Sequence, residues 1–194
     1  MRTVGINVYE YEELSDSAKE KALHDYRSNG DYNGEENKDT LKAFEAIFPI
    51  KINDWCYGGD RNDGVKWEFI EEDEIEQLSG IRLSTYIYNN YFHNLFKGKL
   101  YYGTGYKKKR RSNIIFQNNG VLTGYTTDHS LLDPIYNFLK KPTKQTFHDL
   151  IEECLSEWVN DCTKDMEYYY SEEAFRESCE ANEWEFYESG RMYY

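Results

Sequence analysis

The stretch from about Thr146 to Tyr169 constrains the fold most strongly, because its apolar residues recur at the 3.6-residue period of an α-helix. The apolar positions are Phe147, Leu150, Ile151, Cys154, Leu155, Trp158, Val159, Cys162 and Met166. A helix with so continuous an apolar stripe has to bury it against other elements of the fold. The sequence therefore predicts one long helix with the hydrophobic core on one side.

A row of carboxylates follows the same predicted helix. The row, called the acidic row below, consists of Asp149, Glu153, Glu157, Asp161 and Asp165, with four residues from each to the next and no lysine or arginine among them. Successive charges at this spacing lie ~6 Å apart and repel by about 0.2–0.5 kcal/mol per pair, or about 1–2 kcal/mol for the whole row. This cost calls for a compensating interaction.

Two interpretations of the acidic row remain open. It is either the solvated outer face of an amphipathic helix or a surface that binds a cationic partner. One DNA strand carries a phosphate every ~3.4 Å, so the row could match alternate phosphates at best. The sign of the charge still favours the Lys/Arg groove of a nucleic-acid enzyme as a partner, with an affinity that falls as salt rises.

The net charge of −13 is unevenly distributed along the chain. Residues 1–96 contain 10 basic and 20 acidic side chains, residues 97–144 contain 10 and 2, and residues 145–194 contain 3 and 14. The basic centre could pair with the acidic flanks inside the molecule, or each could bind a partner of opposite charge. The acidic row could therefore pair with the basic segment from Lys107 to Arg111.

The length of 194 residues fits one domain, or a domain with a small appendage. We favour a single α+β domain over residues 1–194, with residues 145–194 as its acidic helical and hairpin C-terminal part. The opening residues show no leader-like apolar segment, and no run approaches the ~18 apolar residues of a membrane span. The four cysteines lack paired CxxC spacing, so reduced thiols are expected. We expect a cytoplasmic protein with no membrane contact; the sequence leaves its oligomeric state open.

The pattern predicts a small mixed or antiparallel sheet with four to five helices. Strands are expected at Thr3–Tyr11, 50–57, 65–70, Lys99–Tyr102 and Asn113–Gln117, and helices after Ser15 or Ser17, at about 36–48, 79–97, 131–139 and 146–169, and after Ser171. A terminal hairpin is expected to turn at Glu188–Arg191.

A second candidate site combines basic and aromatic residues in the centre of the chain. Its members are Tyr101, Tyr102, Tyr106, Lys107, Lys108, Lys109, Arg110 and Arg111. Such a mixture can hold phosphates and stack bases. The alternative is a solvent-exposed hairpin tip, or an internal partner for the acidic C-terminal part.

No complete catalytic or metal motif is present. Gly103 and Gly105 begin a GxGxxG pattern, but Lys108 occupies the position of the third glycine. The histidines are scattered, and Cys154 and Cys162 are expected to be packed thiols. The sequence thus predicts no catalytic residue, no metal site and no cofactor.

Two terminal stretches, INVYEYEELSDSAKEKALHDYR and DMEYYYSEEAFRESCEANEWEFYESGRMYY, together resemble a group of small uncharacterised phage and prophage proteins. The middle segments LKAFEAIFPI, LSGIRLSTYIYNNY and LDPIYNFLKKPTKQTFHDLIEECL are also similar to that group, so the resemblance covers most of the chain. Members are sometimes labelled as antitoxins of toxin–antitoxin systems. The resemblance implies a phage or prophage origin, where small acidic proteins often inhibit host nucleic-acid enzymes, and hence a place in the cytoplasm of the host cell. It carries over no functional residue.

Three function classes follow from these observations. The leading hypothesis is a non-enzymatic protein that binds and inhibits or regulates a host macromolecule through its acidic surface, such as an anti-CRISPR or similar counter-defence protein acting on a nucleic-acid-handling defence enzyme. The alternative is an antitoxin or regulator that binds DNA or RNA through residues 101–111. An enzyme of another type, the third class, requires a deep pocket with convergent polar groups.

Overall fold

The computed structural model of the protein describes residues 5–59, 63–70, 74–96, 100–102, 109–111 and 128–193. The fold class is α+β, as predicted. The elements in chain order are β1 (Tyr9–Glu10), the short 3-10 helix η1 (Tyr11–Glu13), α1 (Asp16–Asn29), α2 (Glu35–Ile47), β2 (Ile50–Cys56), β3 (Gly64–Phe69), the 3-10 helix η2 (Glu74–Gln77), α3 (Gly80–Leu95), β4 (Leu100–Tyr102), β5 (Lys109–Arg111), α4 (Asp128–Lys140), α5 (Phe147–Tyr169), α6 (Glu172–Ala181) and β6 (Glu185–Phe186). The described ranges thus contain six α-helices, one in each of the six predicted helical segments, although the predicted total was four to five. They also contain three two-stranded antiparallel sheets, β1–β6, β2–β3 and β4–β5.

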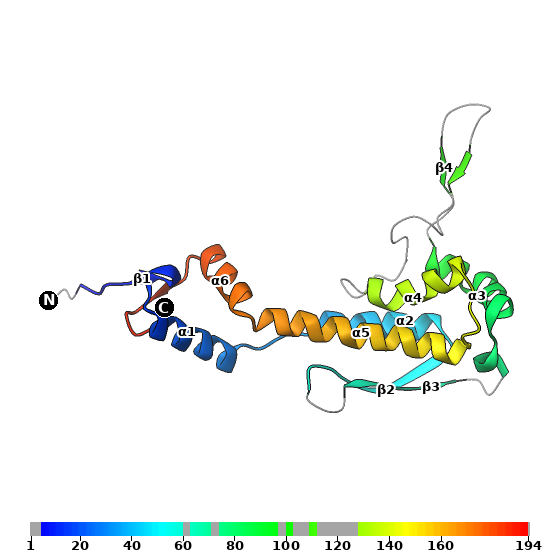
Figure 1. Ribbon diagram of the computed structural model, residues 1–194, viewed down its shortest axis with the longest axis horizontal. Coiled ribbons are helices and arrows are strands. Elements are labelled where there is room, and N and C mark those ends of the chain that lie inside the picture. The colour runs from blue at the N-terminus through cyan, green and yellow to red at the C-terminus, as the bar shows by residue number, and fades with distance from the viewer. Residues whose placement is uncertain are drawn as a thin grey trace. The chain divides into compact units, whose positions relative to one another are not determined.

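The chain divides into two compact units. Unit 1 consists of residues 1–33 and 164–194, and unit 2 of residues 34–163. Unit 1 therefore brings the two ends of the chain together, which Figure 1 shows as blue and red-orange segments lying side by side. Helix α5 contributes residues to both units, so the predicted C-terminal part, 145–194, is shared between them.

The core of unit 2 is built around the apolar stripe of α5. Eight of the nine predicted stripe residues are buried, from Phe147 to Cys162, and Met166, which lies in unit 1, is half-buried. The stripe belongs to the same hydrophobic cluster as Phe44 of α2, Ile87 of α3 and Ile135 of α4, all fully buried. Continuous burial of this kind confirms the long helix predicted from the 3.6-residue period.

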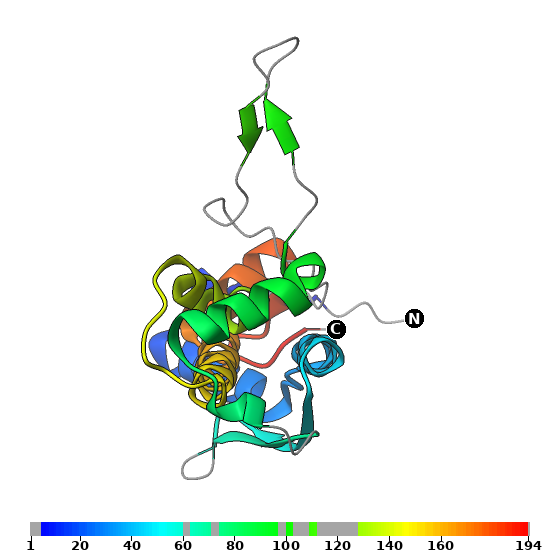
Figure 2. The ribbon, with the colours of Figure 1, turned by 90° about the vertical axis from the view of Figure 1, so that its right-hand side faces the viewer.

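The β2–β3 hairpin and α3 complete unit 2. The paired strands run from Ile50↔Phe69 to Cys56↔Gly64, with an irregularity between Ile52 and Asp54. The start of α3 is tied to the start of α5, because the Phe147 backbone N–H donates to the Leu78 carbonyl at 2.9 Å. Figure 2 shows α3 on the side of unit 2 that faces the viewer.

Unit 1 has its own small core. Its buried residues are Tyr11, Leu14, Ala18, Ala22, Phe175, Cys179 and Phe186, contributed by segments from both ends of the chain. Two helices enter this core with side-chain caps: the Ser15 Oγ accepts from the Ala18 N–H, and the Ser171 Oγ accepts from the Ala174 N–H. Ser171 was predicted as a cap, and the structure selects Ser15 from the two predicted alternatives, Ser15 and Ser17. The two hydroxyls satisfy N–H groups that a helix start leaves unpaired.

The N-terminal strand is much shorter than predicted. Of the expected range Thr3–Tyr11, only Tyr9 and Glu10 form a strand, residues 5–8 have no regular structure, and Thr3 and Val4 lie outside the described residues. Tyr11 instead starts η1, where the Glu10 N–H donates to the Glu13 carboxylate at 3.0 Å. A strand extends only as far as it has a partner, and β6 offers two residues to β1.

The terminal hairpin is confirmed. Phe186 pairs with Met192 in an antiparallel bridge, and the Tyr187 N–H donates to the Arg191 carbonyl at 2.8 Å. Gly190 takes the turn with φ = 81°, a left-handed conformation in which glycine is favoured. The turn of the hairpin therefore lies at Glu188–Arg191, where it was predicted.

The central hairpin has a different partner strand from the one expected. Leu100–Tyr102 agrees with the prediction, but its partner is Lys109–Arg111, which was expected to be a loop. Asn113–Gln117, the predicted partner, lies outside the described residues. The shorter connection brings Lys109–Arg111 opposite β4 in antiparallel register, which is the usual way for a hairpin to pair.

We expect a thiol reagent to modify only Cys56 in the native protein. Cys56 is exposed, whereas Cys154, Cys162 and Cys179 are buried. Burial raises the pKa of the Cys154 thiol well above its ordinary value and that of Cys179 to about 12, so little reactive thiolate forms. Mass spectrometry after timed labelling measures this, with labelling in urea as the control for all four thiols. Rapid native labelling of Cys154 or Cys179 would contradict the packing described.

Candidate functional site

The acidic row begins at the N-terminus of α5, where its first member has a structural role. The Thr146 Oγ1 accepts from the Asp149 N–H, and the Asp149 carboxylate accepts from the Thr146 N–H, both at 3.1 Å. This reciprocal pair satisfies two backbone donors at the start of the helix. The hydrogen bonds from Thr146 lower the pKa of Asp149, so its charge is stabilised where the positive end of the helix dipole lies.

The row drifts around the helix as it advances. Four residues turn an α-helix by 400°, so each member is rotated by about 40° from the one before it. Asp149, Glu153 and Glu157 are exposed on unit 2, whereas Asp161 has turned toward the core and is half-buried. Asp165 belongs to unit 1. The five carboxylates thus do not form one straight surface, and the exposed part of the acidic row on unit 2 is Asp149, Glu153 and Glu157.

Neutral donors compensate much of the row. The Gln145 amide donates to Glu153 at 2.5 Å, and the Ser130 hydroxyl donates to Asp161 at 2.7 Å. Within unit 1, the Tyr32 hydroxyl donates to Asp165 at 2.5 Å. Hydrogen bonds to charged acceptors are stronger than those between neutral groups, so these contacts offset part of the like-charge repulsion expected from the sequence.

No ion pair among the described residues involves the acidic row. Glu157 is exposed and has neither a hydrogen bond nor an ion pair to any described residue. The neighbouring Glu152 is engaged instead, because the Trp67 indole N–H donates to its carboxylate at 2.6 Å. Glu153 and Glu157 are therefore the two members of the row on unit 2 that are exposed and have no role in capping the helix.

The basic segment is described only in part. Lys107 and Lys108 lie outside the described residues, as does Tyr106, so the predicted pairing of Lys107–Arg111 with the acidic row stays a prediction. The backbone register of the β4–β5 hairpin is described: Tyr101 lies opposite Arg110, and Tyr102 lies opposite Lys109. Each of these two tyrosines is thus paired across the hairpin with a basic residue.

Unit 1 contains an acidic groove that the sequence did not single out. Its lining combines five carboxylates with two aromatic rings, and its volume is about 760 Å³; the residues are Glu10, Glu12, Glu180, Glu183, Glu185, Tyr11, Trp184, Arg176 and Cys179. The lining comes from both ends of the chain, which is why no local motif revealed it. The groove is rich in negative charge, as is the exposed part of the acidic row.

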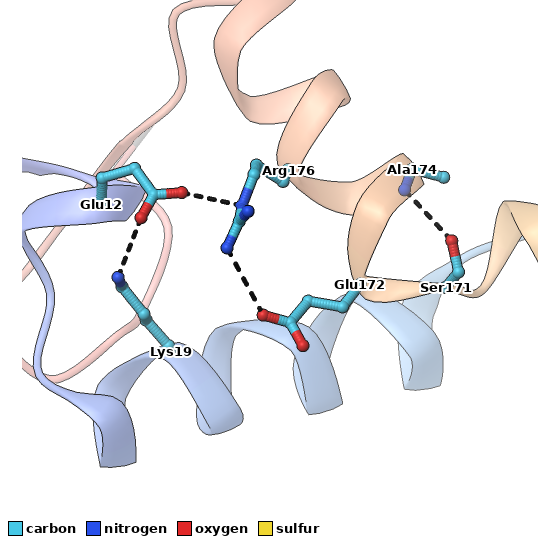
Figure 3. A network of polar contacts seen from close by, with 6 residues as sticks. All are labelled: Glu12, Lys19, Ser171, Glu172, Ala174 and Arg176. Atoms are coloured by element: carbon cyan, nitrogen blue, oxygen red, sulfur yellow. Dashed lines mark hydrogen bonds and ion pairs between the residues drawn. The ribbon is translucent and has the colours of Figure 1, made fainter.

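One carboxylate of this groove forms ion pairs with two basic side chains of unit 1. Glu12 accepts from Lys19 Nζ at 3.0 Å and from Arg176 Nε at 2.8 Å, and Arg176 also lies 3.8 Å from Glu172, as Figure 3 shows. The hydrogen bond from Lys19 lowers the pKa of the Glu12 carboxyl, and the charge of Arg176 acts in the same direction. The network links η1, α1 and α6 across unit 1.

Replacing Glu12 with glutamine should lower the melting temperature at neutral pH and have no effect in acid. Because the native pKa of Glu12 is lowered, its charge stabilises the fold above the unfolded value near 4.5, and this contribution disappears as pH falls through the native pKa. Thermal unfolding of wild type and Glu12→Gln across pH 3–7 measures the difference. Glu20→Gln, which removes an exposed charge of α1 in the same unit, is the control. A pH-independent difference would contradict the role of the charge.

Comparisons with protein family models, with curated proteins and with solved structures gave no match. Among the described residues, no group of three or more His, Cys, Asp or Glu side chains is arranged to hold a metal ion. None of the helices in the described ranges has both the length and the apolar character needed to cross a membrane. The candidate sites therefore rest on the geometry of this chain alone.

Proposed function

We propose that this is a non-enzymatic protein that binds, and thereby inhibits or regulates, a nucleic-acid-handling enzyme of a host cell through the exposed part of its acidic row. The observation that carries the proposal is the state of Glu153 and Glu157. Both are exposed on a helix whose opposite side is fully packed, and neither forms an ion pair with a described residue. These carboxylates remain available to a cationic partner.

A rigid helix is a suitable carrier for such charges. The buried stripe of α5 fixes its backbone, so binding does not have to order the helix first. A groove lined with lysine and arginine would attract this surface as it attracts phosphates, and occupancy of the groove would exclude nucleic acid. Attraction of this kind acts over about 10 Å at 0.1 M salt and over about 3 Å at 1 M, so binding should weaken as salt rises.

The experiment is capture of partners from a bacterial lysate with immobilised protein, followed by identification of the captured proteins. The test variant is Glu153→Lys with Glu157→Lys, which leaves the capping residue Asp149 and the half-buried Asp161 intact. The control is Glu20→Lys with Glu180→Lys, two exposed carboxylates of unit 1, which changes the net charge by the same amount. We expect a basic, nucleic-acid-binding protein that wild type and control capture at low salt and the test variant does not.

Two results would contradict the proposal. Capture of the same proteins by wild type and by the Glu153/Glu157 variant would show that the exposed part of the row does not bind them. Loss of capture with the control variant as well would show that only net charge matters.

A second candidate function is binding of DNA or RNA through the 101–111 segment, as an antitoxin or regulator would require. The register of the β4–β5 hairpin favours it, because two tyrosines lie opposite two basic residues. Aromatic and cationic residues in such proximity can stack bases and neutralise phosphates. The acidic character of both units opposes the approach of a polyanion, so this function ranks second.

An electrophoretic mobility shift at low salt tests the second candidate. A shift with short single-stranded or double-stranded oligonucleotides that disappears when residues 107–111 are replaced with alanine would support it. If neither single-stranded nor double-stranded oligonucleotides are shifted, this function is excluded.

A further inference from the structure

Helix α3 differs in charge from the other α-helices in the described ranges. Of the six α-helices in the described ranges, α3 is the one whose sequence, GIRLSTYIYNNYFHNL, contains no Asp or Glu. Its exposed residues are Ile81, Arg82, Thr85, Tyr88, Asn89, Asn90, His93 and Asn94. In a chain with a net charge of −13, this is a helical surface without any negative charge.

The exposed side of α3 is also partly apolar. Ile81 is 79% exposed and Tyr88 is 39% exposed, and they are seven residues apart, which places them on the same side of the helix. Thr85 lies between them, and its hydroxyl donates to the Ile81 carbonyl at 2.9 Å, so its hydrogen-bond donor is satisfied within the helix. The Tyr88 ring packs against the ring of Phe92, with centroids 4.9 Å apart. We call Ile81, Thr85, Tyr88 and Phe92 the α3 face.

The α3 face is suited to an interface. The fully buried cores of protein interfaces are depleted in charge and enriched in tyrosine, whereas Lys, Glu and Asp are rare in them. Leaving Ile81 in water forgoes the gain from burying an isoleucine side chain. A cationic partner of the kind that would bind Glu153 and Glu157 finds no carboxylate on α3, and Arg82 would repel it.

We propose that the α3 face binds a second copy of this chain, with two α3 helices antiparallel about a two-fold axis. Two chains that each carry −13 charges repel where their carboxylates approach each other, so contact is least costly at a surface that carries none. In the antiparallel arrangement the axis passes near Thr85, and Ile81 of each copy meets Tyr88 of the second copy. Such a two-fold interface uses the same surface on both subunits.

The size of the α3 face sets the strength of this association. Helix α3 has 16 residues and is about 24 Å long, and one helix pair buries less than the ~1,600 Å² of a standard interface. The dimer is therefore weak and depends on protein concentration. Because salt screens the repulsion between the two acidic copies, it becomes stronger as salt rises, opposite to the binding of a cationic partner.

Sedimentation velocity over a range of protein concentrations tests the proposal. The mass of wild type should rise from that of the 23.2 kDa monomer toward twice this value, and more so at high salt. Ile81→Glu should weaken the dimer about a hundredfold, because the lost apolar contact occurs twice in the symmetric interface. Ile70→Glu is the matched control, since Ile70 is 64% exposed in the same unit but lies outside α3. Its dimerisation should equal that of wild type.

Cysteine cross-linking supplies positive evidence that does not depend on loss of binding. In a Cys56→Ser background, which removes the exposed native thiol, Thr85→Cys should form a disulfide between copies under mild oxidation. Ile70→Cys should not. A protein that stays monomeric at all concentrations and salt levels overturns the proposal. A dimer that is equally stable in Ile81→Glu, or one that is cross-linked at position 70 and not at 85, also overturns it.

Discussion

Replacing Phe175 with alanine should destabilise unit 1 by about 3–5 kcal/mol, the usual cost of removing a buried phenylalanine side chain. Phe175 is fully buried, and its ring contacts those of Tyr26 and Tyr11, with centroids 4.7 and 5.1 Å apart. The rings of Trp184 and Phe186 lie 6.3 Å away. The core of unit 1 has few other buried residues, so a cavity at Phe175 removes a large share of it.

The labelling rates of the buried thiols show which of the two units unfolds in this variant. Cys179 belongs to the core of unit 1, and Cys154 and Cys162 belong to that of unit 2. In Phe175→Ala, labelling of Cys179 should accelerate greatly while Cys154 and Cys162 stay protected. Tyr168→Ala is the control, because Tyr168 is an aromatic residue of the same unit that is 47% exposed. Equal acceleration at all three thiols would mean that the two units unfold together.

Replacing Gly190 with alanine should destabilise unit 1 by about 2–5 kcal/mol. A left-handed backbone conformation costs about 1–2 kcal/mol for a residue with a Cβ, and Gly190 has φ = 81°. The added Cβ would overlap the Ala18 carbonyl oxygen and lie 2.9 Å from the Ala18 carbonyl carbon, which adds about 1–3 kcal/mol of overpacking. The turn of the terminal hairpin thus packs directly on α1.

Urea unfolding followed by tryptophan fluorescence measures the effect of Gly190→Ala. The control is Gly5→Ala, because a Cβ at Gly5 has no atom within 4 Å. We expect a lower unfolding midpoint for Gly190→Ala and an unchanged one for Gly5→Ala. Equal midpoints for the two variants would show that the hairpin turn does not pack on α1 as described.

The helices could be predicted because local signals define them. The apolar period of α5 and the serine caps of α1 and α6 each act within one or two turns. The strand at the N-terminus could not, because its length depends on a partner at the other end of the chain. Alternation from Thr3 to Tyr11 predicts a long strand, but among the described residues of that range only Tyr9 and Glu10 pair with β6.

The acidic row could be recognised in the sequence, but the hydrogen-bond donors that offset the repulsion among its carboxylates could not. Spacing alone reveals the acidic row, since positions four residues apart are neighbours on a helix. The donors that stabilise it come from elsewhere: Ser130 is 31 positions from Asp161, and Tyr32 is 133 positions from Asp165. Helix geometry alone predicts that the row turns around the helix toward Asp161. Which members remain exposed, namely a surface centred on Glu153 and Glu157, is known only from the way α5 packs.

The most direct test of the central claim is the salt dependence of binding to a captured partner. The affinity of wild type should fall steadily as salt increases, and Glu153→Lys with Glu157→Lys should lower it by about tenfold or more at low salt. The control variant Glu20→Lys with Glu180→Lys should bind as wild type does. An affinity that does not change with salt would contradict a function based on the exposed part of the acidic row. An affinity that is equal in wild type and the Glu153/Glu157 variant would contradict it too.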